Sequence, residues 1–216
     1  MLLSLRHNFL FVHIAKTGGT SVRAALKRHR YAGRYGLPMF IAHKLDQMTG
    51  HRIGAKFPRH AKAIAAKEML PAEVYDGLFK FVFVRNPWDL QVSSFFHIRK
   101  ERPQVLQGVE SFEQFVHLKF DPERPFNYML DTSAELQREY VTDFQGRLIV
   151  DFVGRYENLQ QDFDQVCERL ELPRVMLPHK RKAEGRESYR KYYNDETAAI
   201  VAEHYRVDIE GFGYEF

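Results

Sequence analysis

Two mostly apolar runs stand out along the chain, at residues 9–14, where His13 is the one polar residue, and at residues 79–84, where Lys80 is. Both are short and rich in aromatic and β-branched residues, which predicts buried β-strands. Shorter strand-like pieces occur at 148–150 and 152–154. Each of the two long runs leads directly into a polar segment, which begins at Ala15 in the first case and at Arg85 in the second.

Between and after these strands, apolar residues recur with helical spacing. The expected helices cover residues 22–27, 61–70, 88–101, 111–120, 133–141, 158–170 and 195–206. Pro71 should end the second of these helices, and Pro87 suits the first turn of the third. Strands separated by helices predict an α/β fold with a mainly parallel sheet. No internal repeat or linker divides the chain, so we expect a single domain over residues 1–216.

The composition is that of a folded globular protein, and the charge narrows the choice of ligand. Of the 216 residues, 44% are hydrophobic and 28% are charged, and the 18 Phe and 11 Tyr suit a compact core. The net charge is +4, without a long Lys/Arg run, which favours small or polymeric anions over a nucleic-acid duplex. Cys167 is the only cysteine, so an intramolecular disulfide is impossible.

The first residues do not have the pattern of a targeting segment. Residues 1–5 are apolar, but polar residues 6–8 interrupt the run, and no small-residue cleavage site follows. No stretch approaches the length of a membrane span. We therefore expect a cytoplasmic protein without a membrane span.

The segment that joins the first strand to the first helix has the features of an anion-binding loop. Gly18 and Gly19 allow close approach of the backbone, and the helix N-terminus adds favourable partial charge. Lys16 adds a positive charge, and the hydroxyl donors are Thr17, Thr20 and Ser21. The lysine precedes the glycines, so the P-loop of kinases, with its magnesium-binding hydroxyl, is absent. A helix start capped by Thr20 or Ser21 is the purely structural alternative.

Residues 11–21 resemble the 5′-phosphosulfate-binding loop of the sulfotransferase family, which uses the donor PAPS (3′-phosphoadenosine-5′-phosphosulfate). The resemblance is closest to the carbohydrate sulfotransferase-like branch and its bacterial relatives. It implies a P-loop-like three-layer fold, with a central sheet flanked by helices. It also implies that Lys16 stabilises the departing phosphate, and that the 5′-phosphate is bound by Thr17, Gly18, Gly19, Thr20 and Ser21. No metal is expected, because the reacting group carries less charge than a γ-phosphoryl group.

Residues 81–96 are similar to the 3′-phosphate-binding segment of the same family. There an arginine at the end of a strand and a serine eight residues later hold the 3′-phosphate, and here these are Arg85 and Ser93. Ser93 lies almost two turns into the helix that follows Pro87, on a side that can face the turn. A planar guanidinium and a hydroxyl are suitable donors to phosphate. Two anion sites indicate a ligand with two separated phosphates, as in PAPS and unlike ATP.

A hydroxyl acceptor must lose its proton as it attacks sulfur, and a histidine or glutamate usually takes that proton. Among ten histidines, His60 resembles the catalytic histidine that many family members carry ahead of a helix. His43 is the next candidate and Glu68 a distant one. His13 follows the period of the first strand and is expected to orient the loop. A capping or exposed role for His60, and a core role for His13, stay open.

The C-terminal third adds one candidate contact. Residues 154–159 resemble the family's Tyr-Glu segment, which implies that Tyr156 lies near the adenine, although a packed tyrosine is the alternative. The basic segment 180–186 stands where relatives often have a loop over the nucleotide, but a solvated charge run also explains it. Residues 104–147 carry no motif and are expected to shape the acceptor site.

Together these features predict an enzyme that transfers a sulfuryl group in line from PAPS to a hydroxyl or amine, with PAP as product. The acceptor is a carbohydrate by resemblance. His60 would remove the proton, Lys16 would stabilise the leaving phosphate, and Arg85 with Ser93 would align the donor. An ATP-dependent small-molecule phosphotransferase and a non-catalytic nucleotide-binding protein are the alternatives. The sequence leaves the acceptor's identity and the oligomeric state open.

Overall fold

A computed structural model describes residues 1–29, 41, 45, 48, 57–178 and 187–216. The chain groups into two compact units. The first, here called the sheet unit, comprises Met1–Ile14, Gly18–Phe83 and Tyr140–Lys180. The second, called the helical unit, comprises Ala15–Thr17, Val84–Glu139 and Arg181–Phe216. Each unit is described by itself.

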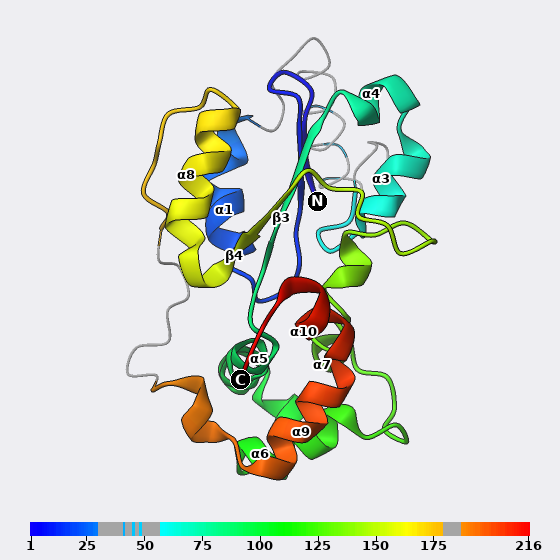
Figure 1. Ribbon diagram of the computed structural model, residues 1–216. Helices are drawn as coiled ribbons and strands as arrows, with labels where there is room; N and C mark the ends of the chain where they lie inside the picture. Colours follow the sequence, from blue (N-terminus) through cyan, green and yellow to red (C-terminus); the bar gives the residue numbers. More distant parts are fainter. Residues whose placement is uncertain (30–40, 42–44, 46–47, 49–56, 179–186) are drawn as a thin grey trace. The chain divides into compact units, whose positions relative to one another are not determined.

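A four-stranded sheet runs through the sheet unit in the order β1, β2, β3, β4 (Figure 1). The strands are β1 (Leu2–Ser4), β2 (Phe9–Val12), β3 (Phe79–Val84) and β4 (Phe152–Arg155). Strands β2 and β3 are parallel and pair Phe9 with Phe79, whereas β1 runs antiparallel to β2. The prediction of a strand over 79–84 is confirmed, and the strand predicted over 9–14 ends two residues earlier. Strand β1 was not predicted, because three residues are too few for a recognisable alternation.

Helices cover both faces of this sheet and give the unit three layers (Figure 1). Helices α1 (Gly19–Leu26) and α8 (Leu159–Arg169) lie on one face, and α3 (Ala63–Met69) and α4 (Ala72–Asp76) lie on the other. The phenylalanines of β2 and β3 form the core with the inward residues of α1 and α8, which are Val22, Leu26, Phe163, Val166 and Cys167. Burying such aromatic side chains is the main source of stability for this packing. The predicted α/β architecture with a central sheet is therefore confirmed.

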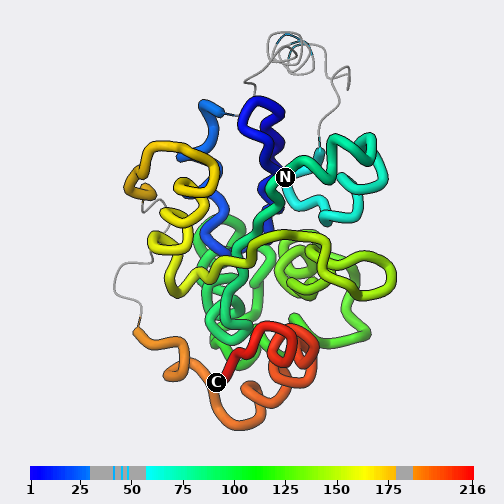
Figure 2. The backbone as a smooth tube through the Cα atoms, turned by 45° about the horizontal axis from the view of Figure 1, so that its top comes forward, coloured from blue at the N-terminus to red at the C-terminus, as the bar shows by residue number. Residues whose placement is uncertain are grey.

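The helical unit packs its helices around a second aromatic core. Its helices are α5 (Pro87–Glu101), α6 (Phe112–Phe120), α7 (Tyr128–Asp131), α9 (Asp195–His204) and α10 (Arg206–Phe212). The core includes Phe95, Phe112, Phe115 and Tyr205. Across both units, the described residues also include short 3-10 helices at Lys27–His29, Pro103–Leu106, Arg138–Tyr140, Tyr156–Asn158 and Tyr189–Tyr192. Figure 2 follows the chain from α9 through α10 to the C-terminus.

The prediction of a helix over residues 133–141 is wrong. That segment contains only a 3-10 turn at Arg138–Tyr140. The N–H groups of Gln137 and Arg138 donate to the carboxylate of Asp208, at 2.7 and 2.8 Å, instead of to a preceding helical carbonyl. Helical spacing of apolar residues does not reveal a distant side chain that takes over the backbone donors.

Two further features bear on the predictions. The helix expected over 195–206 is interrupted at Tyr205, and a further helix, α10, continues to Phe212. Within the described residues, no helix combines the length and the apolar character that crossing a membrane would require.

Candidate functional site

The predicted anion-binding loop is a strand, a turn and a helix. β2 ends at Val12, and α1 begins at Gly19 without any side-chain cap. The Ser21 N–H donates to the carbonyl of Gly18 at 2.9 Å, which closes the turn. The first N–H groups of a helix have no intrahelical acceptor, and they favour an anion. The structural alternative, capping by Thr20 or Ser21, is therefore wrong.

Both glycines of the loop are required by their surroundings in the sheet unit. Gly18 has φ 79°, and a Cβ there would lie 2.6 Å from Leu159 Cδ2 and 3.1 Å from Tyr156 Cδ2. A Cβ on Gly19 would lie 2.2 Å from the Cδ2 atom of His13. Gly18 is thus needed for its left-handed backbone and for space, whereas Gly19 is needed for space alone.

Histidines 13 and 60 lie side by side in the sheet unit. Their ring centroids are 4.8 Å apart, and His60 Nδ1 lies 2.9 Å from the carbonyl oxygen of His13. Because a carbonyl only accepts, His60 carries a proton on Nδ1 in this bond, and in the neutral ring the lone pair is then on Nε2. His13 is buried, and its Nδ1 has no hydrogen-bond partner within the described part of the chain. Burial, followed by the neighbouring His60, lowers the pKa of His13 well below its ordinary value.

Tyr156 and Ser21 also belong to this part of the sheet unit. Tyr156 begins the 3-10 turn after β4, and its ring stands against Gly18. The Ser21 hydroxyl donates to the carbonyl of Pro178 at 2.6 Å. Ser21, predicted as a phosphate donor, therefore already gives its proton to a neighbouring loop. The basic segment 180–186 that follows lies outside the described residues.

The remaining loop residues, Lys16 and Thr17, group with the helical unit. Lys16 has a left-handed backbone with φ 68°, and its carbonyl accepts a hydrogen bond from Arg85 Nη1 at 2.9 Å. Thr17 is buried. The structure thus joins two residues that the sequence predicted for different phosphates, Lys16 and Arg85.

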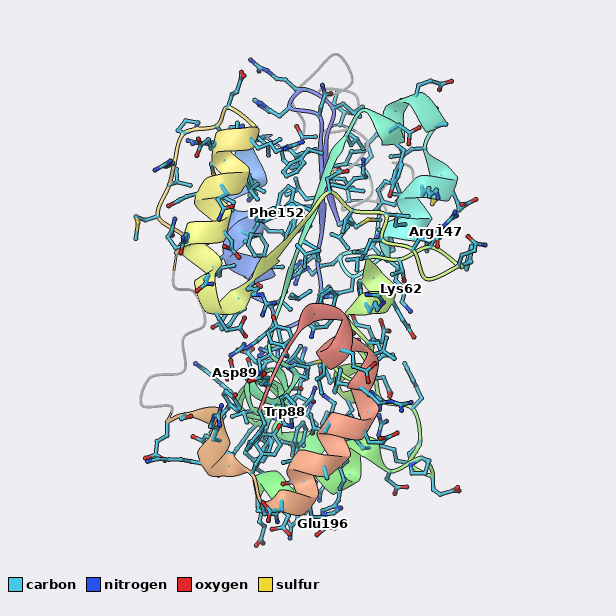
Figure 3. The ribbon with its side chains drawn as sticks, viewed as in Figure 1. Lys62, Trp88, Asp89, Arg147, Phe152 and Glu196 are labelled. Carbon is cyan, nitrogen blue, oxygen red and sulfur yellow. The ribbon has the colours of Figure 1, made fainter. Side chains whose placement is uncertain are left out.

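Arg85 is held by Asp89 at the start of α5. Both Nε and Nη2 of Arg85 lie 2.7 Å from Asp89 Oδ2. The Asn86 side chain caps α5 by accepting from the N–H groups of Trp88 and Asp89, which fixes the helix that carries Asp89. Figure 3 labels Trp88 and Asp89 at this end of α5. The spacing of four residues between Arg85 and Asp89 was a readable signal for an ion pair, which the sequence analysis missed.

The backbone of Arg85 is supported by a buried network. The Gln137 side chain accepts from the Arg85 N–H and donates to the Arg85 carbonyl, both at 2.8 Å. Asp208 holds Gln137 in turn through the backbone bonds described above. Burial raises the pKa of Asp208 from 3.8 to about 6. No local sequence signal connects Arg85 with residues so far along the chain.

Ser93 lies on the same face of α5 as Asp89, one turn further on. It is half-buried, and its hydroxyl makes no hydrogen bond within the described residues. The adjacent Ser94 is buried and engaged, because its hydroxyl bonds to Ser133 at 2.7 Å and accepts from the buried Lys119 at 3.3 Å. Of these two serines, only Ser93 therefore offers a hydroxyl to a ligand.

The other candidates lie elsewhere or outside the described residues. His43 falls outside them. Glu68 is exposed on α3 and makes no hydrogen bond to the histidine pair within the described residues. The predicted residues thus fall into two groups. One comprises Gly18, Gly19, Thr20, Ser21, Tyr156 and His60 in the sheet unit, and the other comprises Lys16, Thr17, Arg85 and Ser93 in the helical unit.

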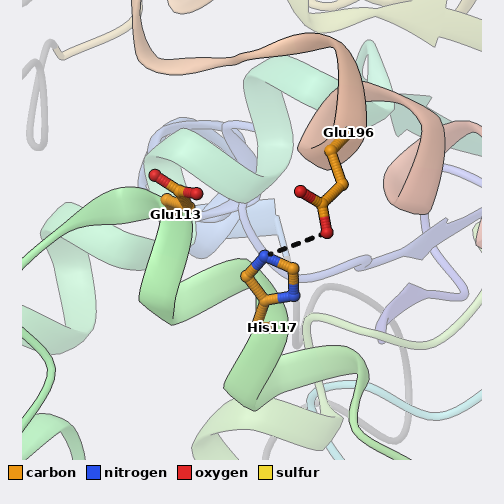
Figure 4. A group of neighbouring side chains, drawn as sticks. All are labelled: Glu113, His117 and Glu196. Carbon is orange, nitrogen blue, oxygen red and sulfur yellow. Dashed lines mark ion pairs between the residues drawn. The ribbon is translucent and has the colours of Figure 1, made fainter.

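One group of side chains in the described part of the chain has ligand spacing for a metal (Figure 4). It consists of Glu113, His117 and Glu196, whose ligand atoms lie within 4.8 Å of one another. All three are exposed, and His117 Nε2 lies 3.7 Å from Glu196 Oε1. Both glutamates stand in first turns of helices, where acidic residues are favourable without any ion. Helix ends and an ion pair account for this group.

Comparison with known proteins agrees with the motifs. The model described as the sulfotransferase family matches residues 1–215. An uncharacterized protein of Archaeoglobus fulgidus is 29% identical over 102 residues, which are 47% of this chain and 74% of that protein. The crystal structure of mouse sulfotransferase SULT7A1 complexed with PAP has 17% identity and a TM-score of 0.40. That match covers 96% of this chain and 67% of the mouse chain.

Proposed function

The chain belongs to the sulfotransferase family and is thereby a PAPS-dependent enzyme, and we propose that it sulfates a carbohydrate hydroxyl. The acceptor oxygen forms a bond to the sulfur of PAPS as the bond from sulfur to the bridging phosphate oxygen breaks. The acceptor loses a proton, and PAP leaves. An amine acceptor would react in the same way. We further propose that residues 1–216 act as one domain in the cytoplasm.

The loop between β2 and α1 is the observation that carries this proposal. No side chain caps the N-terminus of its helix, and its two glycines pack so closely against Tyr156, Leu159 and His13 that neither position has room for a Cβ. The backbone amides of such a helix start suit the 5′-phosphate of the donor. In the proposal, residues 17–20 bind this phosphate, and the Lys16 ammonium stabilises the negative charge that develops on it as it leaves. Ser21 would join them only by giving up the bond from its hydroxyl to the carbonyl of Pro178. Tyr156 lies beside the loop and contacts the adenine.

Arg85 and Ser93 recognise the 3′-phosphate in this proposal. The Ser93 hydroxyl makes no bond within the described residues, which supports a role in binding. Arg85 is buried, with 4% of its side chain exposed, and already bonds Asp89 and Lys16. A 3′-phosphate would therefore share this guanidinium with the carboxylate of Asp89. Arginine has five N–H donors, so one guanidinium can bond oxygens of both the phosphate and Asp89.

His60 is proposed as the general base. Its bond to the carbonyl of His13 fixes the proton on Nδ1 and leaves the lone pair on Nε2. Nε2 takes the proton of the acceptor hydroxyl while the oxygen attacks sulfur. His13 orients His60 through its carbonyl and packs against Gly19, and so links the base to the phosphate loop.

Incubation with PAPS labelled in its sulfuryl group tests the proposal, with a panel of saccharides, phenols and amines as acceptors. The label should move to a saccharide, and Lys16→Ala should abolish this transfer. Transfer only to phenols or amines would contradict the carbohydrate assignment. Transfer at the same rate by Lys16→Ala would contradict the role of Lys16. Phosphoryl transfer from Mg-ATP without any use of PAPS would contradict the donor.

A further inference from the structure

Arg85 stands between two acceptors in the helical unit that differ in charge. Nη1 donates to the neutral carbonyl of Lys16 at 2.9 Å, while Nε and Nη2 both point to one oxygen of Asp89, Oδ2, at 2.7 Å. The guanidinium is rigid and planar, so the orientation of one edge determines the direction of the other. Asp89 therefore determines where Nη1 of Arg85 points.

The carbonyl at the far end of this chain of contacts belongs to an unusual backbone. Lys16 is one of three described residues other than glycine with positive φ, at 68°. A left-handed backbone costs a residue with a Cβ on the order of 1–2 kcal/mol, and persists only where surrounding contacts hold it. The bond from Arg85 is one such contact. The direction in which the Lys16 side chain leaves the loop depends on this backbone.

The Asp89–Arg85 pair is protected from solvent. Only 4% of the Arg85 side chain and 17% of the Asp89 side chain are exposed. Charge-assisted bonds of this kind hold their geometry better than surface ion pairs, which water and salt weaken. The Arg85 backbone is held as well, because Gln137 bonds both its N–H and its carbonyl. Gln137 thus fixes the backbone of Arg85, and Asp89 holds one edge of its guanidinium.

We propose that Asp89 is a positioning residue, which acts through Arg85 to align Lys16 and couples recognition of the 3′-phosphate to sulfuryl transfer. The inference rests on the proposed function, in which Arg85 meets the 3′-phosphate and Lys16 meets the phosphosulfate. A 3′-phosphate and Asp89 are both anions on the same guanidinium, so donor binding draws Arg85 toward the phosphate. The Nη1 bond transmits this movement to the backbone of Lys16. The 3′-phosphate then contributes to rate as well as to affinity.

The test compares Asp89→Asn with wild type in two measurements, the affinity for PAP and the turnover of a donor. Loss of the negative charge weakens the two bonds that orient the guanidinium, so kcat with PAPS should fall between about 10-fold and 100-fold, the scale of a misplaced reacting group. The Kd for PAP should stay within about threefold of wild type or become tighter, because an anion that competes with the 3′-phosphate is gone. Arg85→Lys should instead weaken PAP binding and lower kcat together.

A second donor isolates the coupling. Adenosine-5′-phosphosulfate lacks the 3′-phosphate, so wild type should use it with a much lower kcat than PAPS. In Asp89→Asn the ratio of the two kcat values should shrink toward one. Glu101→Gln, an exposed substitution on the same helix, is the matched control and should keep the wild-type ratio. Asp89→Glu keeps the negative charge, so its kcat should lie between those of Asp89→Asn and wild type. If Asp89→Asn does not fold, Asp89→Glu is measured in its place.

The outcomes separate this inference from the function on which it rests. A wild-type protein that neither binds PAP nor uses PAPS would overturn the proposed function. A wild-type protein that does both, together with an Asp89→Asn variant of unchanged kcat ratio, would overturn only the role of Asp89. Parallel losses of PAP affinity and kcat in Asp89→Asn would also overturn it, because they are the signature of a residue that serves binding alone.

Discussion

Lys16 combines a strained backbone with a positively charged side chain. Its side chain supplies the only lysine ammonium between Val12 and Val22, and its backbone adopts a left-handed conformation that lysine seldom takes. A simple positive charge near a phosphate would not need such a backbone. The conformation fits a lysine whose direction matters, as expected for a group that acts on a leaving oxygen.

Replacing Lys16 by methionine should separate binding from catalysis. The change keeps the length of the side chain and removes the ammonium, so kcat for sulfuryl transfer should fall by about 100-fold or more. The Kd for PAP should change much less, because the backbone amides and Arg85 remain. Single-turnover kinetics with labelled PAPS and calorimetric titration with PAP measure the two quantities. Equal losses in both would contradict a role confined to the transition state.

His13 should make the stability of the protein depend on pH. Its pKa is lowered well below 6.5 by burial, then by His60. A depressed pKa in the folded state means that stability is present above the unfolded pKa and is lost as the pH falls toward the folded pKa. In denaturant titrations, the free energy of unfolding should be lower at about pH 5 than at about pH 7. In His13→Gln this decrease should be smaller. The exposed His117→Gln is the matched control. An undiminished pH dependence in His13→Gln would contradict this account.

At the scale of elements, local patterns predicted what local interactions determine. The run at 79–84, apolar except for Lys80, is a strand at those residues, and Pro87 lies in the first turn of α5 as predicted. The segment 133–141 was predicted wrongly because Asp208 takes the backbone donors of Gln137 and Arg138. Such a contact joins α10 to a loop far earlier in the chain, which no window of sequence contains.

The loop depends on an exact fit between Gly19 and His13. Gly19→Ala would place a Cβ inside the contact distance of the His13 ring, so the free energy of unfolding should fall by about 1–3 kcal/mol. PAP affinity should fall with it, because the amides of the loop would shift. In a His13→Ala background the same substitution should cost less, which a double-mutant cycle detects. Additive effects of the two substitutions would show that the ring is not what excludes the methyl group.

Asp208 should produce the opposite pH dependence from His13. Its pKa is raised to about 6 by burial, so its contribution to stability is present below 3.8 and is lost as the pH rises through about 6. Between about pH 4 and pH 7, the free energy of unfolding of wild type should fall by on the order of 2–3 kcal/mol relative to that of Asp208→Asn. This figure follows from about 1.4 kcal/mol for each unit by which the pKa is shifted. Denaturant titrations of both proteins give this difference. A difference that does not change with pH would contradict the raised pKa.

At the scale of the whole molecule, the sequence motifs predicted the family and its nucleotide donor. Contacts between residues far apart in the sequence determine how the candidate site residues are held. The order of Lys16, Gly18 and Gly19 was sufficient to separate this loop from a kinase loop. The bond from Arg85 to Lys16 was not predictable, because nothing in either motif shows that the two meet. The two bonds from the Gln137 side chain to the backbone of Arg85, just after β3, were not predictable either. The candidate site residues are therefore held by hydrogen bonds that the motifs alone do not indicate.

The central claim is that this chain binds a nucleotide with separate 5′- and 3′-phosphates. The most direct measurement is the stability of the protein with PAP, compared with ADP and with Mg-ATP. At about 100 times its Kd, PAP should add about 2.7 kcal/mol to the free energy of unfolding. ADP lacks the 3′-phosphate and should add far less, and Arg85→Ala should reduce the effect of PAP. No stabilisation by PAP, or a larger one by Mg-ATP, would contradict the account.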